Sequence, residues 1–197
     1  MRAWSYFRAV NQPSKTWPSL RANGWDIDLA AHIRRGGPVL GLCGDYQMLS
    51  RTISDPGGVE GPARTVPGLG HLDVGTVMQP QKRLARITGT HPLTGAQVTG
   101  HEIHMGLTTG ADCARAWLNM GGQPKGAASA DGLVQVCYVH GVLASDAFCA
   151  AYLAGLGVAS TLQFEIGVDA ALDALTNRLE AHLYINFLLS LAKEPTV

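Results

Sequence analysis

The chain has no excess of charge of either sign and no long apolar run. Its 197 residues include 15 Lys or Arg and 15 Asp or Glu, which gives a formal net charge of zero. A basic surface for nucleic acid or for an anionic membrane is therefore not expected. The sequence also lacks an apolar run of about 18 residues that could span a bilayer, and its start lacks the apolar core of a secretion signal. We expect a cytoplasmic protein that binds neither nucleic acid nor membrane.

Paired cysteines and a nucleotide-binding motif are also missing. The four cysteines, at positions 43, 113, 137 and 149, have none of the close paired spacings of zinc sites or disulfide frameworks, which predicts reduced thiols. No Gly-x-x-x-x-Gly-Lys-Ser/Thr phosphate loop occurs, so a nucleotide site of that type is not expected. We therefore expect neither a metal nor a bound cofactor in this chain.

What the chain does contain is typical of one α/β domain. Hydrophobic residues make up 46% of the sequence, which is enough for a single core. Helical patterns over Asp26 to Arg34 and Asp146 to Ala154 alternate with strand-like segments over Leu72 to Met78 and Gln97 to Ile103. This alternation predicts a mostly parallel sheet flanked by helices on both faces. The glycine- and proline-rich region from Asp55 to Gly70 is expected to be a loop.

A helix is also predicted near the end of the sequence, from Val168 to Ala192. Leucines at positions 172, 175, 179 and 183 recur at spacings of three and four, which places them along one face of that helix. We expect this leucine face to pack on the core. The alternative is a helix that binds a partner.

A cysteine stands where a short apolar run meets a helical pattern. Val39 to Leu42 is typical of a buried strand, Cys43 follows it, and Tyr46 to Leu49 begins a helix. This layout is that of a nucleophile elbow. The positive end of the helix dipole and the free N–H groups of the first turn would favour the thiolate of Cys43, which is the form that attacks carbonyl carbon. The alternative is that Cys43 is a small apolar residue of the core.

A histidine at the end of another strand-like run could serve this thiol as a base. The β-rich part of the segment Val134 to Phe148 ends at His140 and Gly141. A cysteine and a histidine that are far apart in sequence but adjacent in the fold form the usual thiolate pair. Cys43 and His140 are therefore the predicted catalytic residues.

Two histidines and a glutamate between Gly100 and Gly106 suggest a metal site, but their spacing argues against one. On a strand, His101 and His104 point to opposite faces, whereas Glu102 and His104 share a face. The helical zinc motif needs histidines four residues apart, with the glutamate next to the first. We expect no metal at this segment.

Several motifs together are similar to a known family. The blocks that carry the similarity follow the family's order between residues 14 and 192, and they include GWDIDLAAHIRRGG, GLCGDYQML, VPGLGHLDV, GHEIHMG and YVHGVLASDAF. They resemble the glutamine amidotransferase domain at the carboxyl end of cobyric acid synthase, an enzyme of cobalamin biosynthesis. The resemblance implies a class I glutamine amidotransferase-like fold, which is flavodoxin-like. We expect an atypical, truncated or altered segment over residues 1–15 and the amidotransferase domain over residues 16–197.

The resemblance implies that the chain is a glutaminase. Cys43 would attack the side-chain amide of glutamine, His140 would pass the proton to the departing ammonia, and water would then hydrolyse the thioester. Gly44, Tyr46 and Gln47 would bind the glutamine or shape its pocket, although a role of Gln47 in helix packing is equally compatible with the sequence.

The GHEIHMG block lies close to the catalytic cleft in the family, where tyrosine takes the place of His101. The resemblance therefore implies that Glu102 and His104 contact the substrate or support His140. A purely structural role for these two residues is the alternative.

Three positions differ from related domains. Most wider relatives have a glutamate two residues after the histidine, where this chain has Val142, and the cobyric acid synthase branch also lacks that glutamate. Asp45 stands where the family has glycine, and its carboxylate would either raise the pKa of Cys43 or point outward at the start of the helix. Pro13 replaces a glycine near the oxyanion site and cannot donate an N–H, a loss that typically lowers turnover about 100- to 1000-fold.

The resemblance also implies partners. In cobyric acid synthase, an ATP-dependent synthetase domain uses the ammonia to amidate adenosylcobyrinic acid a,c-diamide. We therefore expect glutamine as the substrate, the synthetase domain as a partner in cis or in trans, and ATP with Mg only in that domain. Three alternatives remain: a catalytically impaired remnant or partner-binding module of the same fold, a related cobyrinic acid a,c-diamide synthase or cell-wall amidotransferase subunit, and a general cysteine hydrolase.

Overall fold

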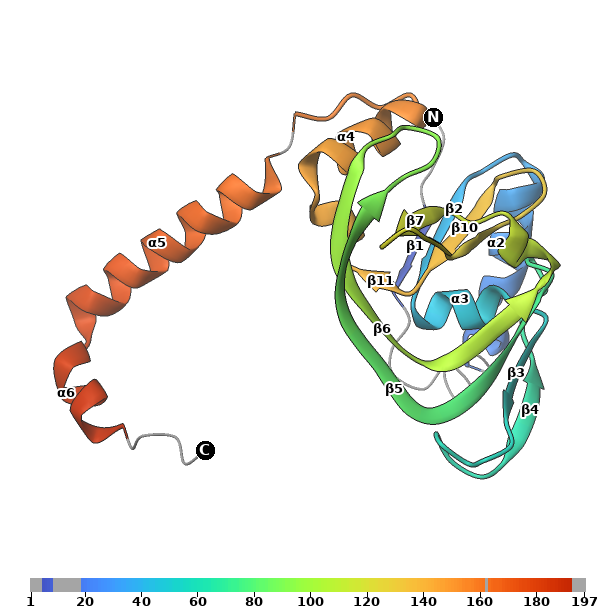
Figure 1. Ribbon diagram of the computed structural model, residues 1–197, viewed down its shortest axis with the longest axis horizontal. Helices are drawn as coiled ribbons and strands as arrows, with labels where there is room; N and C mark the ends of the chain where they lie inside the picture. Colours follow the sequence, from blue (N-terminus) through green and yellow to red (C-terminus); the bar gives the residue numbers. More distant parts are fainter. Residues whose placement is uncertain (1–4, 9–18, 162, 193–197) are drawn as a thin grey trace.

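Two β-sheets form the body of the chain in the computed structural model, which describes residues 5–8, 19–161 and 163–192 (Figure 1). The smaller sheet has the strand order β1-β2-β10-β9. Strands β1, β2 and β10 are parallel, and β9 is antiparallel to β10. Their bounds are Ser5–Arg8 for β1, Val39–Leu42 for β2, Ala127–Ala128 for β9 and Val134–Cys137 for β10.

The larger sheet is built around a long antiparallel pair, β5 (Val74–Thr90) and β6 (Gln97–Gly110). Its order is β11-β6-β5-β3-β4, and β7 and β8 extend it from β5. The other bounds are Thr52–Asp55 for β3, Arg64–Pro67 for β4, Leu118–Met120 for β7, Gln123–Lys125 for β8 and Val139–His140 for β11. Among its described strands, β3 and β5 alone pair in parallel. The predicted α/β class is confirmed, but parallel pairing dominates only the smaller sheet, so the sheets are mixed rather than mostly parallel.

Helices α2 (Trp25–Arg34), α3 (Gly44–Leu49) and α4 (Asp146–Gly155) lie against these sheets. The helices predicted over 26–34 and 146–154 are thereby confirmed. Acidic residues in the first turn of α2 and basic residues in its last turn complement the helix dipole. After α2, Gly36 has φ of 77°, a left-handed conformation that glycine adopts without strain. Two short 3₁₀ turns, η1 (Ala111–Ala114) and η2 (Val142–Ala144), complete the body.

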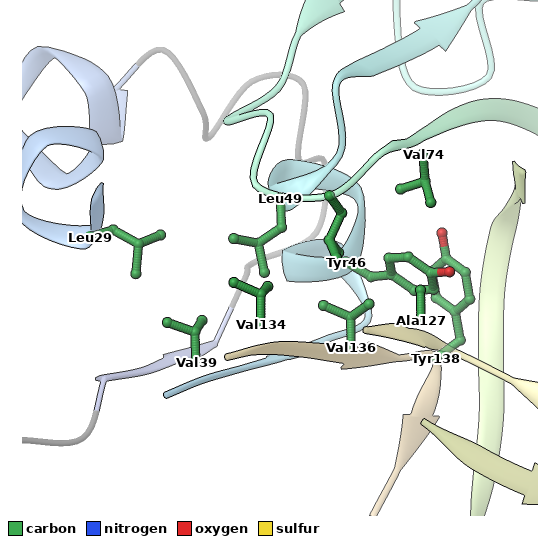
Figure 2. Packing of buried hydrophobic residues seen from close by; sticks show 10 residues of the cluster. Leu29, Val39, Tyr46, Leu49, Val74, Ala127, Val134, Val136 and Tyr138 are labelled. Atoms are coloured by element: carbon green, nitrogen blue, oxygen red, sulfur yellow. The ribbon is translucent and has the colours of Figure 1, made fainter. Parts of the chain in front are cut away.

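The apolar core lies on both faces of β2. Val39 faces a cluster that also contains Leu29 of α2 and Leu49 of α3 (Figure 2). Leu40, one residue further, faces the opposite side and joins a cluster with Phe148 of α4. Val39 and Leu40 are 2% and 1% exposed, as is typical of a parallel strand covered on both sides. This buried strand ends at the predicted nucleophile, whose position is therefore fixed by the core.

Strand boundaries differ from those expected in the middle of the chain. The region predicted to be a loop contains β4, which pairs with β3. The strands predicted over 72–78 and 97–103 are parts of the longer β5 and β6. The register of this pair shifts between Met78 and Arg83, so that the intervening polar, proline-containing stretch forms an irregularity and the pairing then continues.

The helical pattern after the body forms two helices, α5 (Phe164–His182) and α6 (Ile185–Leu191), which extend away from the sheets (Figure 1). The prediction that their leucine face packs on the core is wrong, because the four leucines are between 42% and 55% exposed. The Phe164 N–H donates to the Asp146 carboxylate at 2.8 Å, so α5 begins at α4 and then leaves the body. In the described ranges, no helix combines the length and the apolar character needed to cross a membrane.

Part of the atypical segment over residues 1–15 is described. Residues 5–8 form β1, which pairs with β2 along its full length. A first parallel strand is therefore present, although its residues do not resemble the family. Pro13, with its expected effect on the oxyanion site, lies outside the described residues.

Candidate active site

Cys43 lies in the sharp turn between β2 and α3. Its backbone has φ of 58° and ψ of −110°, and it is the only non-glycine residue with positive φ in the described chain. Such a conformation is strained for a residue with a side chain and is typical of a nucleophile elbow. The Cys43 N–H donates to the carbonyl of Cys137 at 2.9 Å, which ties the turn to the end of β10. Gly41 allows the close packing of α3, because a Cβ there would come within 2.6 Å of Leu49.

The surroundings of Cys43 favour the thiol over the thiolate. Its Sγ donates to the carbonyl oxygen of Ile103 in β6 at 3.5 Å. Burial raises the pKa of the Cys43 thiol above its ordinary value, and the N–H of Gly44 opposes this rise. The carboxylates of Asp45 and Glu60 raise that pKa further. The stabilisation of thiolate expected from the helix start is therefore outweighed, and Cys43 needs a base to take its proton.

His140 lies in the same corner of the fold as Cys43, in the two-residue strand β11. It pairs with His101 of β6, and the chain reaches it three residues after Cys137, whose carbonyl accepts the Cys43 N–H. Ile103, whose carbonyl accepts the thiol, is two residues from His101 along β6. The two predicted catalytic residues therefore come from strands that meet at one corner. His140 is exposed, which suits a group that exchanges protons with substrate and water.

Asp45 and Val142 are both buried. Asp45 is 1% exposed, and its Oδ2 accepts the N–H of Leu42 at 3.3 Å. The alternative that Asp45 points outward is therefore wrong. Val142 is fully buried in the second apolar cluster, so no carboxylate at that position orients His140.

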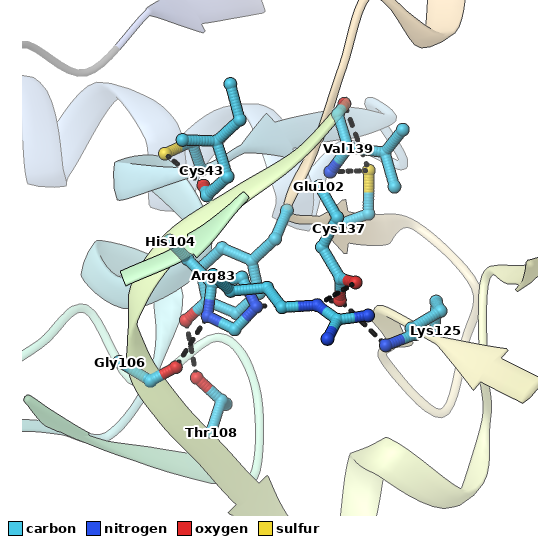
Figure 3. A network of polar contacts seen from close by, with 11 residues as sticks. Cys43, Arg83, Glu102, His104, Gly106, Thr108, Lys125, Cys137 and Val139 are labelled. Carbon is cyan, nitrogen blue, oxygen red and sulfur yellow. Dashed lines mark hydrogen bonds and ion pairs between the residues drawn. The ribbon is translucent and has the colours of Figure 1, made fainter. Parts of the chain in front are cut away.

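Glu102 and His104 share one face of β6, as predicted, and form a polar network (Figure 3). The Glu102 carboxylate accepts hydrogen bonds from Lys125 Nζ at 2.7 Å and Arg83 Nε at 3.1 Å. It also lies 3.5 Å from His104 Nε2. Burial by itself would raise the pKa of Glu102, but the bonds from Lys125 and Arg83 outweigh it and hold the pKa below its usual value. Glu102 is therefore a carboxylate at neutral pH that joins β5, β6 and β8.

The ring of His104 is held on several sides. Its Nδ1 donates to the carbonyl oxygen of Gly106 at 2.7 Å, and the ring stacks on Tyr138 with centroids 4.2 Å apart. The Tyr138 hydroxyl contacts Thr108 Oγ1 at 2.5 Å, and burial raises the pKa of this tyrosine to about 12. Together with Glu102, these contacts favour the structural alternative for His104, because all of them are made to neighbouring residues of the same sheets.

The predicted pocket residues of α3 lie below the surface. Gly44, Tyr46 and Gln47 are all buried, the last two with 3% and 4% exposure. The Tyr46 ring packs on Tyr138 with centroids 4.7 Å apart, and its hydroxyl contacts Cys113 Sγ at 3.7 Å. This burial therefore agrees with the alternative that Gln47 serves in helix packing. Any effect of these side chains on glutamine would then be indirect, through the shape of the elbow.

Sequence reasoning did not identify Arg83, Lys125 or Tyr138. Tyr138 stands two residues before His140 in the same motif, which could have indicated it. Lys125 reaches Glu102 from β8, a three-residue strand without a recognisable pattern, and only the folded sheet brings the two together. Within the parts of the chain that the structure describes, no group of three His, Cys, Asp or Glu side chains is suited to hold a metal ion.

Comparisons with known proteins show which proteins this chain resembles. A cobyric acid synthase of Rhodobacter capsulatus is 58% identical over 175 residues, and one of Bradyrhizobium diazoefficiens is 53% identical over 175 residues. Each alignment covers 88% of this chain but 36% of that relative, so the chain spans about a third of their length.

A solved structure and a family model also match glutamine amidotransferases. A solved structure described as a crystal structure of glutamine amidotransferase shares the fold, with a TM-score of 0.51 at 16% identity over 75% of this chain and 76% of that one. Residues 14–148, which include Cys43 and His140, match the model of the CobB/CobQ-like glutamine amidotransferase domain. The chain belongs to the CobB/CobQ-like glutamine amidotransferase family.

Proposed function

We propose that this chain is the glutaminase part of a cobyric acid synthase. Family membership supports an amidotransferase role, and the relatives named cobyric acid synthase support a role in cobalamin biosynthesis. The observation that carries the proposal is the strained backbone at Cys43, next to the strands that hold His140. A cysteine that only filled the core would not require this conformation.

The proposed reaction begins with transfer of the Cys43 thiol proton to the His140 imidazole. The thiolate attacks the side-chain carbonyl carbon of glutamine, whose oxygen becomes an oxyanion. The Gly44 N–H, which already lowers the pKa of Cys43, is one donor available to this charge. The C–N bond breaks as the imidazolium gives its proton to the leaving nitrogen, which departs as ammonia. Water, deprotonated by His140, then hydrolyses the thioester to glutamate and the free thiol.

The ammonia would be consumed by a different domain. The relatives are nearly three times longer than their match to this chain, which covers 36% of each. We propose that an ATP-dependent synthetase domain, in cis or in trans, activates carboxylates of adenosylcobyrinic acid a,c-diamide for amidation. ATP and Mg²⁺ would bind there, since this sequence has no phosphate loop.

Affinity labelling tests the glutaminase proposal. Purified protein is treated with a chloro-ketone analogue of glutamine, and its peptides are mapped by mass spectrometry with and without glutamine. We expect Cys43 to be modified, and glutamine to slow the modification. Cys43→Ser should lower glutamine hydrolysis at least about 1000-fold, and His140→Asn about 100- to 10,000-fold. Cys149→Ser is the matched control, because this half-buried thiol lies in α4, and it should change neither measurement.

Two results would contradict the glutaminase proposal. One is a folded protein in which Cys43 stays unmodified, and the other is glutamine hydrolysis that survives Cys43→Ser. Either would favour a chain that keeps the fold of the family without its activity.

A further inference from the structure

Tyr138 stands between β10 and β11, at the point where the chain passes from the smaller sheet to the larger one. The residue before it is Cys137, whose carbonyl oxygen accepts the N–H of Cys43 at 2.9 Å. The predicted base, His140, follows two residues after it. The backbone at Tyr138 therefore links the contact that holds the nucleophile turn to the short strand that carries the base.

The main chain of Tyr138 also bonds to β6, the third element at this corner. Its carbonyl oxygen accepts the N–H of Ile103 at 3.1 Å. The carbonyl oxygen of Ile103 in turn accepts the thiol of Cys43 at 3.5 Å. Two hydrogen bonds through one residue of β6 thus connect Tyr138 to the sulfur. A shift of the backbone at Tyr138 would therefore change the position in which the thiol is held.

The side chain of Tyr138 is 8% exposed and is anchored to the elbow helix and to β6. Its ring packs on Tyr46 of α3 with centroids 4.7 Å apart (Figure 2). It also stacks on His104 of β6 with centroids 4.2 Å apart. Its hydroxyl contacts Thr108 Oγ1 at 2.5 Å, and that oxygen lies 2.7 Å from Thr76 Oγ1 of β5. A buried ring that is held by two other rings and at its tip has little freedom, and it restrains the backbone that carries it.

We infer that Tyr138 is a positioning residue of the glutaminase reaction, whose ring keeps the Cys43 thiol and the His140 imidazole in reacting geometry. This inference rests on the proposed glutaminase function and adds a residue to the same site. Tyr138 would act through its neighbours and would touch neither substrate nor reacting atoms. Proton transfer needs the two groups within hydrogen-bond reach, and a displacement of about 1 Å can lower turnover about 100-fold.

Two substitutions at Tyr138 separate the ring from the hydroxyl. Tyr138→Leu removes the ring contacts with α3 and β6, and it should lower kcat for glutamine hydrolysis about 10- to 100-fold with a much smaller change in KM. Tyr138→Phe keeps both ring contacts and should restore kcat to within about threefold of the native value. Turnover is expressed per Cys43 that the chloro-ketone analogue of glutamine labels at completion, so that unfolded protein does not count.

Tyr152→Leu is the matched control. Tyr152 is also a buried tyrosine, 7% exposed, but it lies in α4 and stacks on Phe148 of the same helix. Its truncation should remove a similar amount of packing and leave kcat per labelled site unchanged. Tyr46→Leu removes the same ring contact from the side of α3, so it should lower kcat as Tyr138→Leu does, even if Tyr138→Leu does not fold.

The outcomes distinguish the inference from the function on which it rests. A native kcat per labelled site in Tyr46→Leu and in any folded Tyr138→Leu would overturn the inference and leave the glutaminase function standing. An equal loss in Tyr152→Leu, or a loss in Tyr138→Phe as large as that in Tyr138→Leu, would overturn it as well. A native chain that neither hydrolyses glutamine nor is labelled at Cys43 would overturn the function and the inference together.

Discussion

Asp45 places a negative charge next to the sulfur that has to become negative. Its carboxylate is buried and accepts the N–H of Leu42 at the end of β2, so it cannot turn away from the elbow without losing that bond. After burial itself, it is one of the groups that raise the pKa of Cys43. Because only the thiolate reacts, a raised pKa lowers the reactive fraction at every pH below it.

Asp45→Asn should make Cys43 more reactive. The amide oxygen of asparagine can still accept the Leu42 N–H, but the charge is gone, so the pKa of the thiol should fall. We expect alkylation of Cys43 by iodoacetamide at neutral pH to become about two- to tenfold faster, with the midpoint of its pH profile moved down. The exposed Asp28 of α2 provides the control, and Asp28→Asn should leave the profile in place. An identical midpoint in Asp45→Asn and the native chain would show that the sulfur does not sense this charge.

At the scale of residues, the sequence predicted which residues form the elbow better than it predicted where their side chains point. The motif around Cys43 predicted the elbow, because an apolar strand, small flanking residues and a helix start are local features. Whether Asp45 pointed inward depended on how α3 packs on β2, where Gly41 lets the helix approach closely. The pairing of His140 with His101, and of His101 with Arg86, could not be predicted from spacing, because three separate strands contribute these residues.

At the scale of elements, one buried carboxylate joins three strands of the larger sheet. Glu102 of β6 binds Arg83 of β5 and Lys125 of β8. Its pKa is held below the ordinary value of 4.5 in the folded chain. The stability that it contributes is therefore fully present above pH 4.5 and is lost as the pH falls through the lower folded pKa.

Glu102→Gln should destabilise the chain in a pH-dependent way. We expect the free energy of unfolding, measured with urea at pH 7, to fall by about 1–3 kcal/mol, because two charge-assisted hydrogen bonds are weakened. The difference from the native chain should shrink as the pH falls from 4.5 through the lower pKa of the folded carboxyl, because the native carboxyl then also becomes neutral. Glu180→Gln, on the exposed part of α5, should show no such dependence. A difference that stayed constant with pH would attribute the loss to packing instead of charge.

The limits of prediction for the strands have a physical cause. The helices over 26–34 and 146–154 are set by local periodicity and were predicted correctly. The part of β5 after Met78 contains a proline and several basic residues without regular alternation, so nothing local marks it as a strand. It is a strand because β6 pairs with it, and β6 lies on the far side of a turn in the sequence. The same reason explains why the sheets are mixed, since pairing direction depends on distant partners.

At the scale of the whole molecule, the leucine face of α5 shows that periodicity can predict a helix without predicting where the helix packs. The spacing of the leucines correctly predicted a helix with an apolar face. It did not determine what covers that face, because the position of a helix relative to the sheets depends on the segment that leads to it. In the described residues, no side chain of α5 or α6 belongs to the three apolar clusters of the body.

Removal of α5 and α6 should therefore leave the body stable. We expect a chain that ends at residue 160 to unfold, by circular dichroism, within about 2 °C of the full chain. Four leucines packed on the core would contribute several kcal/mol, and their loss would lower Tm by roughly 10 °C or more. Leu72→Ala calibrates the measurement, because this 1% exposed side chain belongs to the core, and its truncation should cost about 2–5 kcal/mol. A drop in the shortened chain as large as that of Leu72→Ala would show that the leucine face packs on the body in solution.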